Sequence, residues 1–300
     1  MSVLPNFLII GQIKAGTSSL HAYLSEHPEV FMPANKELRL FSEVIGPEAD
    51  GPLQVDPVYF QKRQNAGMPN SLAEYSALFA QGANFKAIGE ASPEYVHTPR
   101  AAQQIYDKLP GVRLIVSLRR PSDRAYSNFQ MADRGRDPAA FEQAFRDGMQ
   151  SGSMHYLNAF EQLKAYYDLF DAQQIKAIKF DDLVSNTETT VKSVFEFLDV
   201  ATDHQVDTGQ AHNEGGQWKS PAMGKMVDRF RANWALMSKV KSLVPASVWQ
   251  MAKSLESKNR TPAPKLTQEL RAEIDACFSE DTKRLQDLVG VDLSNWCPEG

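Results

Sequence analysis

Short apolar runs alternate with segments of helical periodicity along the first two-thirds of the chain. Residues 7–10 (FLII) and 113–118 (RLIVSL) are apolar runs of strand length, and residues 175–180 (IKAIKF) alternate between apolar and polar positions. Residues 86–90 (KAIGE) form a weaker run of the same kind. Runs of about four to eight such residues are typical of buried strands. The pattern therefore predicts four strands in the interior of the protein.

Segments with apolar residues at helical spacing separate these strands. Leu20, Tyr23 and Leu24 follow the i, i+3, i+4 spacing of one helix face, which predicts a helix from Thr17 to about residue 27, ended by Pro28. Further helices are predicted at 99–108, from 121 onward, at 156–170 and at 187–198. Alternation of strands and helices is typical of an α/β fold, so we expect a mostly parallel sheet with helices on both faces.

The last third of the chain has a different character. Residues 266–290 carry apolar residues at helical spacing up to Gly290, which predicts one amphipathic helix that serves packing. Between residues 221 and 260, eight Lys and Arg residues stand against two acidic residues. We interpret this basic segment as a helical cover over the site with a solvated face. Peripheral contact with a membrane or an anionic glycan is the alternative.

Composition and charge exclude some function classes. The net charge of −5 gives no general affinity for nucleic acid. Cys277 and Cys297 lack the spacing of a metal site and fit a reducing compartment, which predicts a cytoplasmic location. The first residues, MSVLPNF, lack the features of a signal peptide, and no apolar run approaches the roughly 20 residues of a transmembrane helix.

The predicted strand ends show where a ligand would bind, because ligands of such sheets lie beyond the carboxyl ends of the strands. Glycine or charged residues follow the strands at 11–17, 90–92, 119–120 and 181–182. The stretch GQIKAGTSSL after the first strand is a glycine loop that leads into a helix. The predicted anion-binding groups are the backbone N–H groups and hydroxyls of Ala15, Gly16, Thr17, Ser18 and Ser19.

The position of Lys14 distinguishes this loop from a nucleoside-triphosphate loop. In the pattern G-x-x-x-x-G-K-[ST] the lysine follows the second glycine, whereas Lys14 precedes Gly16. This order predicts a shorter phosphate chain as the ligand. A tight strand-to-helix turn capped by a threonine is the alternative interpretation.

A second candidate anion site lies in LRRPSDRAYSNF, residues 118–129. Arg119 ends the strongest predicted strand, and Ser127 lies about two helical turns further on. An arginine fork with a hydroxyl suits a second phosphate. The alternative is a helix start at the surface, with Arg120, Asp123 and Arg124 paired in solvent.

Taken together, the two stretches resemble the sulfotransferase family that uses 3′-phosphoadenosine 5′-phosphosulfate (PAPS). GQIKAGTSSL is similar to the motif that holds the 5′-phosphosulfate, and LRRPSDRAYSNF to the one that holds the 3′-phosphate. NKELRLFSE, residues 35–43, resembles the Lys-Glu-x-x-x-Phe stretch of heparan-sulfate and Golgi-type carbohydrate sulfotransferases. GEASPEY and IKFDDL also resemble family segments, so the resemblance spans about residues 7–198. Arg120 departs from the family, which often has Asp or Asn there.

The resemblance implies a P-loop-like fold and roles for particular residues. Lys14 would stabilise the charge on the leaving phosphate, Glu37 would be the general base, and Glu90 is the second candidate for the base. The alternatives are an ion pair of Glu37 with Lys36 or Arg39 and, for Glu90, the favoured role of hydrogen bonding that holds loops in place. Trp218 or Lys219, in a loop that only loosely matches the family, would cover the nucleotide. The chain is predicted to form one domain over 1–300, with an α/β nucleotide-binding core at 1–200 and a covering loop and helical region at 201–300.

The predicted reaction moves a sulfuryl group from PAPS to an acceptor hydroxyl or amine, without a metal. A carbohydrate is the favoured acceptor, and a small secondary metabolite or lipid is the alternative. His155 is a further candidate base. Asp181 and Asp182 would instead bind magnesium if the protein were a small-molecule kinase, and a non-catalytic nucleotide-binding protein is the third hypothesis.

Overall fold

The computed structural model describes residues 2–42, 68–98, 100–132, 138–207, 217–218, 260–261 and 265–297. Five strands in these ranges form one sheet in the order β2-β3-β1-β4-β5, and every neighbouring pair is parallel. The strands are β1 (Phe7–Gly11), β2 (Val30–Phe31), β3 (Ala87–Ala91), β4 (Arg113–Leu118) and β5 (Ile175–Lys179). The predicted α/β fold with a parallel sheet is therefore confirmed. The two-residue strand β2 was not predicted, because it is too short to show a period.

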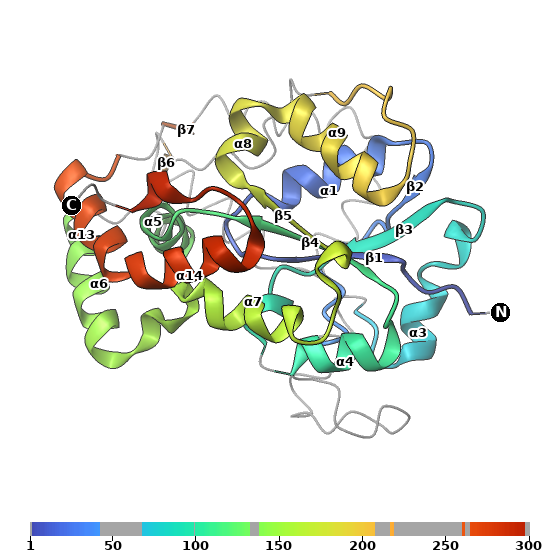
Figure 1. The fold of residues 1–300 in the computed structure, drawn as a ribbon, viewed down its shortest axis with the longest axis horizontal. Coiled ribbons are helices and arrows are strands. Elements are labelled where there is room, and N and C mark those ends of the chain that lie inside the picture. The colour runs from blue at the N-terminus through green and yellow to red at the C-terminus, as the bar shows by residue number, and fades with distance from the viewer. Residues whose placement is uncertain are drawn as a thin grey trace.

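Helices cover both faces of this sheet (Figure 1). Leu8 and Ile10 of β1 belong to the core beneath α4 and α7, whereas Phe7 and Ile9 belong to the core beneath α1 and α9. All five residues of β1 are buried, as expected for the central strand of a covered parallel sheet. The bounds of the helices on the two faces are α1 (Thr17–Glu26), α4 (Ala101–Lys108), α7 (Ala159–Tyr167), α8 (Phe180–Ser185) and α9 (Thr187–Leu198).

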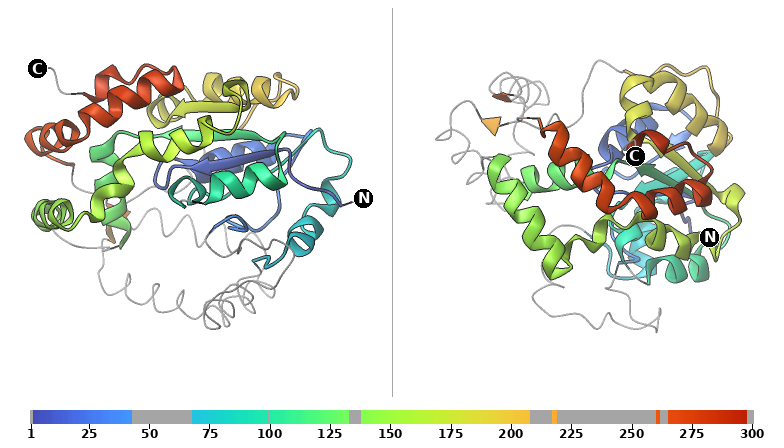
Figure 2. Two further views of the ribbon diagram at one scale, coloured as in Figure 1. Left: turned by 60° about the horizontal axis from the view of Figure 1, so that its bottom comes forward. Right: turned by 60° about the vertical axis from the view of Figure 1, so that its left-hand side comes forward.

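The remaining helices of the described ranges lie outside these two layers or at their edges (Figure 2). They are α3 (Leu72–Ala77), α5 (Pro121–Ala132), α6 (Pro138–Ser151), α13 (Gln268–Cys277) and α14 (Ser279–Val289). A separate pair of two-residue strands, β6 (Gln217–Trp218) and β7 (Arg260–Thr261), is antiparallel. In the ranges that the structure describes, no helix is both long and apolar enough to cross a membrane.

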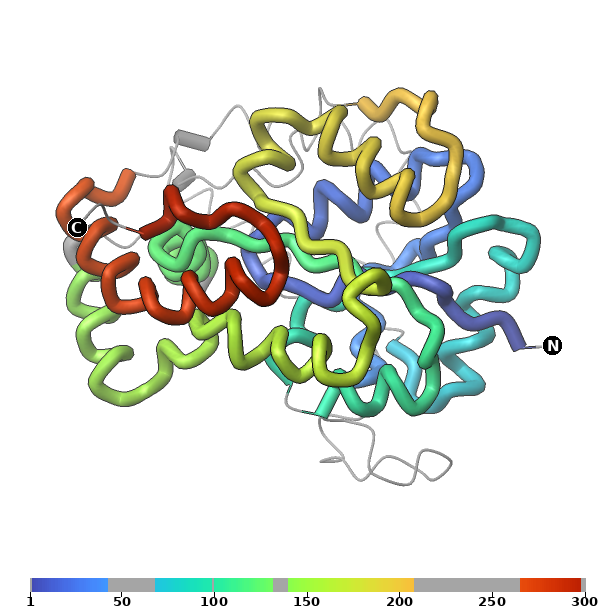
Figure 3. Tube along the Cα trace, viewed as in Figure 1, coloured from blue at the N-terminus to red at the C-terminus, as the bar shows by residue number. Residues whose placement is uncertain are grey.

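The C-terminal segment corrects one prediction. The single helix predicted over 266–290 is two helices, because Phe278 leaves the helical conformation and packs into a core cluster with Phe141 and Phe145 of α6. The helices α13 and α14 then lie against α5 and α7 (Figure 3). The predicted packing role holds for the contacts described here. The division of the chain near residue 200 stays a prediction.

Two carboxylates, one buried and one half-buried, join these C-terminal helices to the N-termini of other helices. Asp275 of α13 accepts hydrogen bonds from the backbone N–H and the hydroxyl of Ser122, each at 3.0 Å. Asp281 of α14 accepts from the backbone N–H of Ala159 at 2.8 Å. Burial raises the pKa of both carboxyl groups. Negative charge is favourable at a helix N-terminus, so α13 and α14 fix where α5 and α7 begin.

Candidate functional site

The loop between β1 and α1 has the backbone conformation of an anion-binding turn. Lys14 and Gly16 both adopt left-handed conformations, with φ of 69° and 80°. A Cβ atom on Gly16 would lie 2.8 Å from the Phe180 ring, so only glycine fits. Gly16 is the N-cap of α1 and has no side chain with which to cap the first turn of that helix. The N–H groups of this turn therefore suit an oxyanion ligand.

The end of β4 supports this anion loop from one side. The Ser117 hydroxyl donates to the carbonyl of Ala15, and the Arg119 guanidinium donates to the carbonyl of Lys14 at 2.6 Å. The backbone N–H of Arg119 also donates to the Gln12 side chain at 3.2 Å. The guanidinium lies over the Phe180 ring, 4.4 Å from its centroid, and burial lowers its pKa. Arg119 is thus part of the support of the first loop, a position that sequence spacing did not indicate.

The second candidate site begins where α5 leaves β4. The charged residues at the start of this helix do not pair with one another in solvent. Arg120 lies 3.8 Å from Asp275, and Asp123 accepts a hydrogen bond from Arg271. Asp275 and Arg271 both belong to α13. Arg124 is 1% exposed and donates to the carbonyl of Tyr156. Ser127 lies half-buried on the same helix. The start of α5 is therefore held in place by contacts with α13 and with Tyr156.

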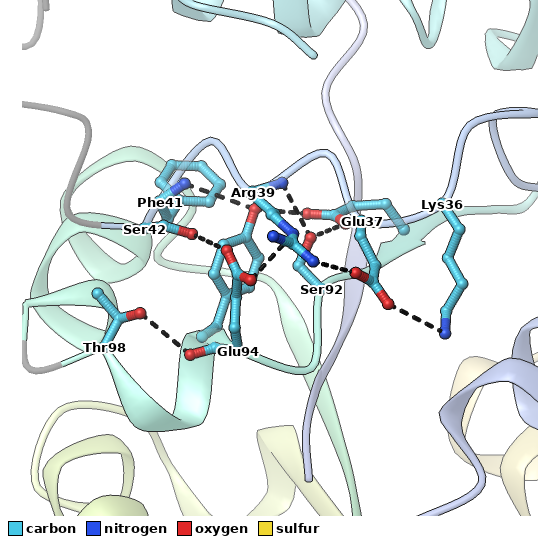
Figure 4. A network of polar contacts seen from close by, with 10 residues as sticks. Lys36, Glu37, Arg39, Phe41, Ser42, Ser92, Glu94 and Thr98 are labelled. Atoms are coloured by element: carbon cyan, nitrogen blue, oxygen red, sulfur yellow. Dashed lines mark hydrogen bonds and ion pairs between the residues drawn. The ribbon is translucent and has the colours of Figure 1, made fainter. Parts of the chain in front are cut away.

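The predicted acidic loop lies beside the end of β3. Its residues Glu37 and Arg39 adopt left-handed backbone conformations, with φ of 64° and 54°. The backbone N–H of Glu37 donates to the carbonyl of Ala91 at 3.0 Å, and that of Arg39 donates to the Ser92 hydroxyl at 3.0 Å. The Glu37 side chain, 31% exposed, forms an ion pair with Arg39 and lies 3.6 Å from the ammonium of Lys36 (Figure 4).

Lys36 connects the acidic loop to the anion loop. Its ammonium donates to the Ser18 hydroxyl at 2.7 Å and to the Thr17 hydroxyl at 3.4 Å. Burial lowers the pKa of Lys36, and the neighbouring Glu37 opposes this change. From the sequence, Lys36 was expected only as an alternative ion-pair partner of Glu37 in the Lys-Glu-x-x-x-Phe stretch, and its contact with the anion loop was not predicted.

Glu90, at the end of β3, lies in the interior and is 1% exposed. Its carboxylate accepts hydrogen bonds from Tyr95 at 2.7 Å, Ser92 at 2.7 Å and Tyr75 at 3.3 Å. Burial raises the pKa of Glu90 to about 7, and these donors oppose the rise. Ser92 also accepts from the backbone of Arg39, and Tyr95 accepts from the backbone of Phe41 at 3.5 Å, so two hydroxyls link Glu90 to the acidic loop.

The other candidate residues lie in different surroundings. His155 is exposed, and its Nδ1 atom lies 3.1 Å from the carbonyl of Gly152. Asp181 accepts a hydrogen bond from the Trp296 indole at 3.3 Å. Across the described ranges, no group of three or more His, Cys, Asp or Glu side chains could hold a metal ion. Trp218 lies in β6, whereas Lys219 and most of the basic segment fall outside the described residues.

Comparison with known proteins gives a family match over residues 5–204, to the model described as "Sulfotransferase family". A crystal structure of a sulfotransferase from Alicyclobacillus acidocaldarius superposes on 98% of this chain and 99% of that chain, with a TM-score of 0.67 and 26% identity. Among curated relatives, membrane-associated sulfotransferase kil1 of Dictyostelium discoideum is 30% identical over 132 residues, 43% of this chain and 23% of that protein.

Two human proteins show the same similarity over different lengths. Carbohydrate sulfotransferase 15 is 29% identical over 246 residues, which cover 66% of this chain and 44% of that protein. Bifunctional heparan sulfate N-deacetylase/N-sulfotransferase 3 is 28% identical over 151 residues, 50% of this chain and 15% of that protein. The chain thus spans less than half the length of these curated relatives.

Proposed function

Because the chain belongs to the sulfotransferase family, we propose that it moves a sulfuryl group from PAPS to a hydroxyl or amine of a carbohydrate acceptor. The observation that carries this proposal is the meeting of two loops. The anion loop presents Lys14 and the uncapped first turn of α1, and the acidic loop brings Glu37 next to it through the contact of Lys36 with Ser18. Anion binding and a carboxylate base are the two elements that sulfuryl transfer needs.

We assign the two phosphate groups of the donor to two sets of residues. The first turn of α1 and its hydroxyls suit the 5′-phosphosulfate, and Arg119 with Ser127 would hold the 3′-phosphate. Residues proposed to bind the donor are Lys14, Ala15, Gly16, Thr17, Ser18, Ser19, Arg119, Ser127, Trp218 and Lys219. PAPS supplies a sulfuryl group attached to a phosphate that leaves readily.

We assign different roles to Lys14 and Glu37. Lys14 would stabilise the negative charge that grows on the bridging oxygen, because a cation placed where charge develops lowers the barrier most. Glu37 would take the proton from the acceptor, since its half-exposed carboxylate is accessible to a substrate. Lys14 belongs to the anion loop, and the cationic groups of Lys36 and Arg119 contact it, so we propose that these side chains take the place of a metal and expect activity to survive a metal chelator.

The names of the relatives support a carbohydrate acceptor. One relative is a carbohydrate sulfotransferase, and another is an N-sulfotransferase of heparan sulfate. We therefore propose a sugar hydroxyl or amine, and a cytoplasmic location stays a prediction from the sequence. A screen with sulfur-labelled donor across sugars, lipids and phenols would identify the acceptor class. Label on a lipid or phenol and on no sugar would contradict the proposed acceptor.

Donor binding can be tested without knowing the acceptor. Calorimetry would compare adenosine 3′,5′-bisphosphate (PAP) with ATP and magnesium. We expect PAP to bind more tightly, because the two anion sites match its separated phosphates. Tighter binding of ATP would favour the small-molecule kinase instead. Once an acceptor is known, Lys14→Ala should reduce turnover far more than donor affinity, whereas Lys164→Ala on the exposed face of α7 should change neither.

A further inference from the structure

The ammonium of Lys36 occupies an unusual position for a lysine of a surface loop. It lies at the N-terminus of α1, within hydrogen-bond distance of Ser18 at 2.7 Å, and 3.6 Å from the Glu37 carboxylate. The side chain is 23% exposed. The ammonium therefore lies where the anion loop and the acidic loop touch, with the Ser18 hydroxyl and the Glu37 carboxylate as its acceptors.

This position is unfavourable for a cation unless a further negative charge lies close to it. The N-terminus of a helix carries partial positive charge, so a neighbouring ammonium is repelled there. Burial also disfavours the charged form and lowers the pKa of Lys36. Glu37 offsets part of this cost, but it is shared with the guanidinium of Arg39, which also pairs with Glu94 at 2.9 Å. An additional anion between the ammonium and α1 would relieve the repulsion.

Building on the proposed function, we propose that Lys36 is a second catalytic cation, which binds a non-bridging oxygen of the sulfuryl group during transfer. Lys14 belongs to the donor loop, whereas Lys36 precedes Glu37 directly on the loop of the base. In an in-line displacement the sulfur lies between the leaving oxygen and the attacking oxygen. A cation that contacts Ser18 and Glu37 at once is placed between those two sides.

The step balances without a proton from Lys36. The acceptor oxygen forms a bond to sulfur while the bond from sulfur to the phosphate oxygen breaks. The acceptor proton passes to the Glu37 carboxylate, and the electron pair of the broken bond stays on the phosphate, which leaves as part of PAP. Lys36 remains an ammonium throughout and stabilises the oxygens of the moving group.

The difference between PAPS and PAP provides the test, because PAP lacks only the sulfuryl group. Calorimetry would measure both nucleotides with the wild type, Lys36→Met and the control Lys164→Met. We expect Lys36→Met to weaken PAPS binding on the order of tenfold, as for loss of a charge-assisted hydrogen bond. Its affinity for PAP should change by no more than about twofold, the scale of a neutral surface substitution. Lys164→Met should change neither.

Two outcomes would overturn the role of Lys36. An equal loss of affinity for both nucleotides would make Lys36 a ligand of a nucleotide phosphate, and no loss for either would make it only a partner of Glu37. Lys36→Gln, which keeps a hydrogen bond to Ser18 without the charge, repeats the comparison if Lys36→Met does not fold. Failure of the wild type to bind PAP more tightly than ATP would contradict the proposed function itself, which is a separate result.

Discussion

Glu37 and Glu90 lie in one polar network, and their surroundings are opposite. Glu37 is half-exposed on a loop and is flanked by two cations, Lys36 and Arg39. Glu90 is 1% exposed at the end of a strand and is surrounded by three hydroxyl groups. Two hydroxyls connect the two regions: Ser92 donates to Glu90 and accepts from the backbone of Arg39, and Tyr95 donates to Glu90 and accepts from the backbone of Phe41.

The comparison of Glu37 with Glu90 shows that a raised pKa does not by itself identify a catalytic residue. Burial raises the pKa of Glu90 to about 7 against the opposing effect of its hydroxyl donors, a value that would suit a general base. Its oxygens are occupied by Tyr75, Tyr95 and Ser92, however, and its burial keeps a large acceptor away. The loop of Glu37 holds non-glycine residues in left-handed conformations, which costs about 1 kcal/mol or more for each. We therefore infer that Glu90 stabilises the loop that presents Glu37.

The largest expected effect is on turnover in Glu37→Gln. An amide cannot take the acceptor proton, and loss of a general base typically reduces turnover about 100-fold to 10,000-fold. The half-exposed carboxylate contributes little to folding, because solvent screens its ion pairs. Turnover and thermal unfolding measured on the same preparation would show a large kinetic loss with an almost unchanged melting temperature.

The matched variant is Glu90→Gln, which changes the same group in the other region. We expect a clear drop in melting temperature and only a small change in turnover, since a buried hydrogen-bond network loses an acceptor. If Glu90→Gln abolishes transfer while Glu37→Gln remains active, the two roles are reversed and Glu90 is the base.

A second prediction concerns stability between pH 4.5 and 7. The ordinary pKa of a glutamate here is 4.5, and burial raises that of Glu90 to about 7 in the folded protein. The folded state therefore binds the proton more tightly, so this contribution to stability is complete below pH 4.5 and is lost as pH rises through about 7. By linkage the free energy of unfolding would fall by up to about 3 kcal/mol.

Urea unfolding of the wild type and of Glu90→Gln across this pH range would measure that contribution. The amide does not titrate, so the decline should be smaller in the variant by the contribution of Glu90. Parallel curves for the two proteins would show that Glu90 has an ordinary pKa, and the contrast with Glu37 would then lose its electrostatic basis.

Ser92→Ala tests the link between the two regions. The substitution removes a donor to Glu90 and an acceptor for the Arg39 backbone, so we expect a loss of about 1–3 kcal/mol in the free energy of unfolding. Turnover should fall several-fold through displacement of Glu37, with donor affinity preserved. Ser76→Ala, on α3, is the control for loss of a serine hydrogen bond elsewhere, and should change stability alone. Unchanged turnover in Ser92→Ala would show that Ser92 does not couple Glu90 to the position of Glu37.

Local pattern predicted most of the fold. The strands at 113–118 and 175–179 and the helix at 187–198 lie within one residue of their expected bounds, because long apolar periods determine them. The break at Phe278 was missed, since the sequence on both sides keeps a helical period and only the contact with α6 turns the chain. Long-range packing decided that boundary.

The site was predictable only in part for the same reason. The anion loop and Glu37 stand in motifs that show in the sequence. The donors to Glu90 do not, because Tyr75 comes from α3 and meets β3 only in the folded sheet. The contact of Lys36 with Ser18 likewise joins residues 18 positions apart. Contacts between residues that are distant in the sequence leave no periodic pattern in it. The burial of Glu90 and the position of Lys36 could therefore be recognised only in the structure.

The smallest expected effect separates the donors of Glu90 from each other. Tyr75→Phe removes the longer hydrogen bond, 3.3 Å, and should cost about 1 kcal/mol of stability, whereas Tyr95→Phe removes the 2.7 Å bond and should cost more. Both donors favour the ionised carboxylate, so either substitution raises the pKa of Glu90 and moves the loss of stability to higher pH. Turnover at saturating substrate should stay within about twofold of the wild type in Tyr75→Phe, because the loop of Glu37 keeps its contact with Ser92. A variant with intact stability and strongly reduced turnover would instead place Tyr75 beside the reacting groups, and the division between a catalytic and a supporting carboxylate would no longer hold.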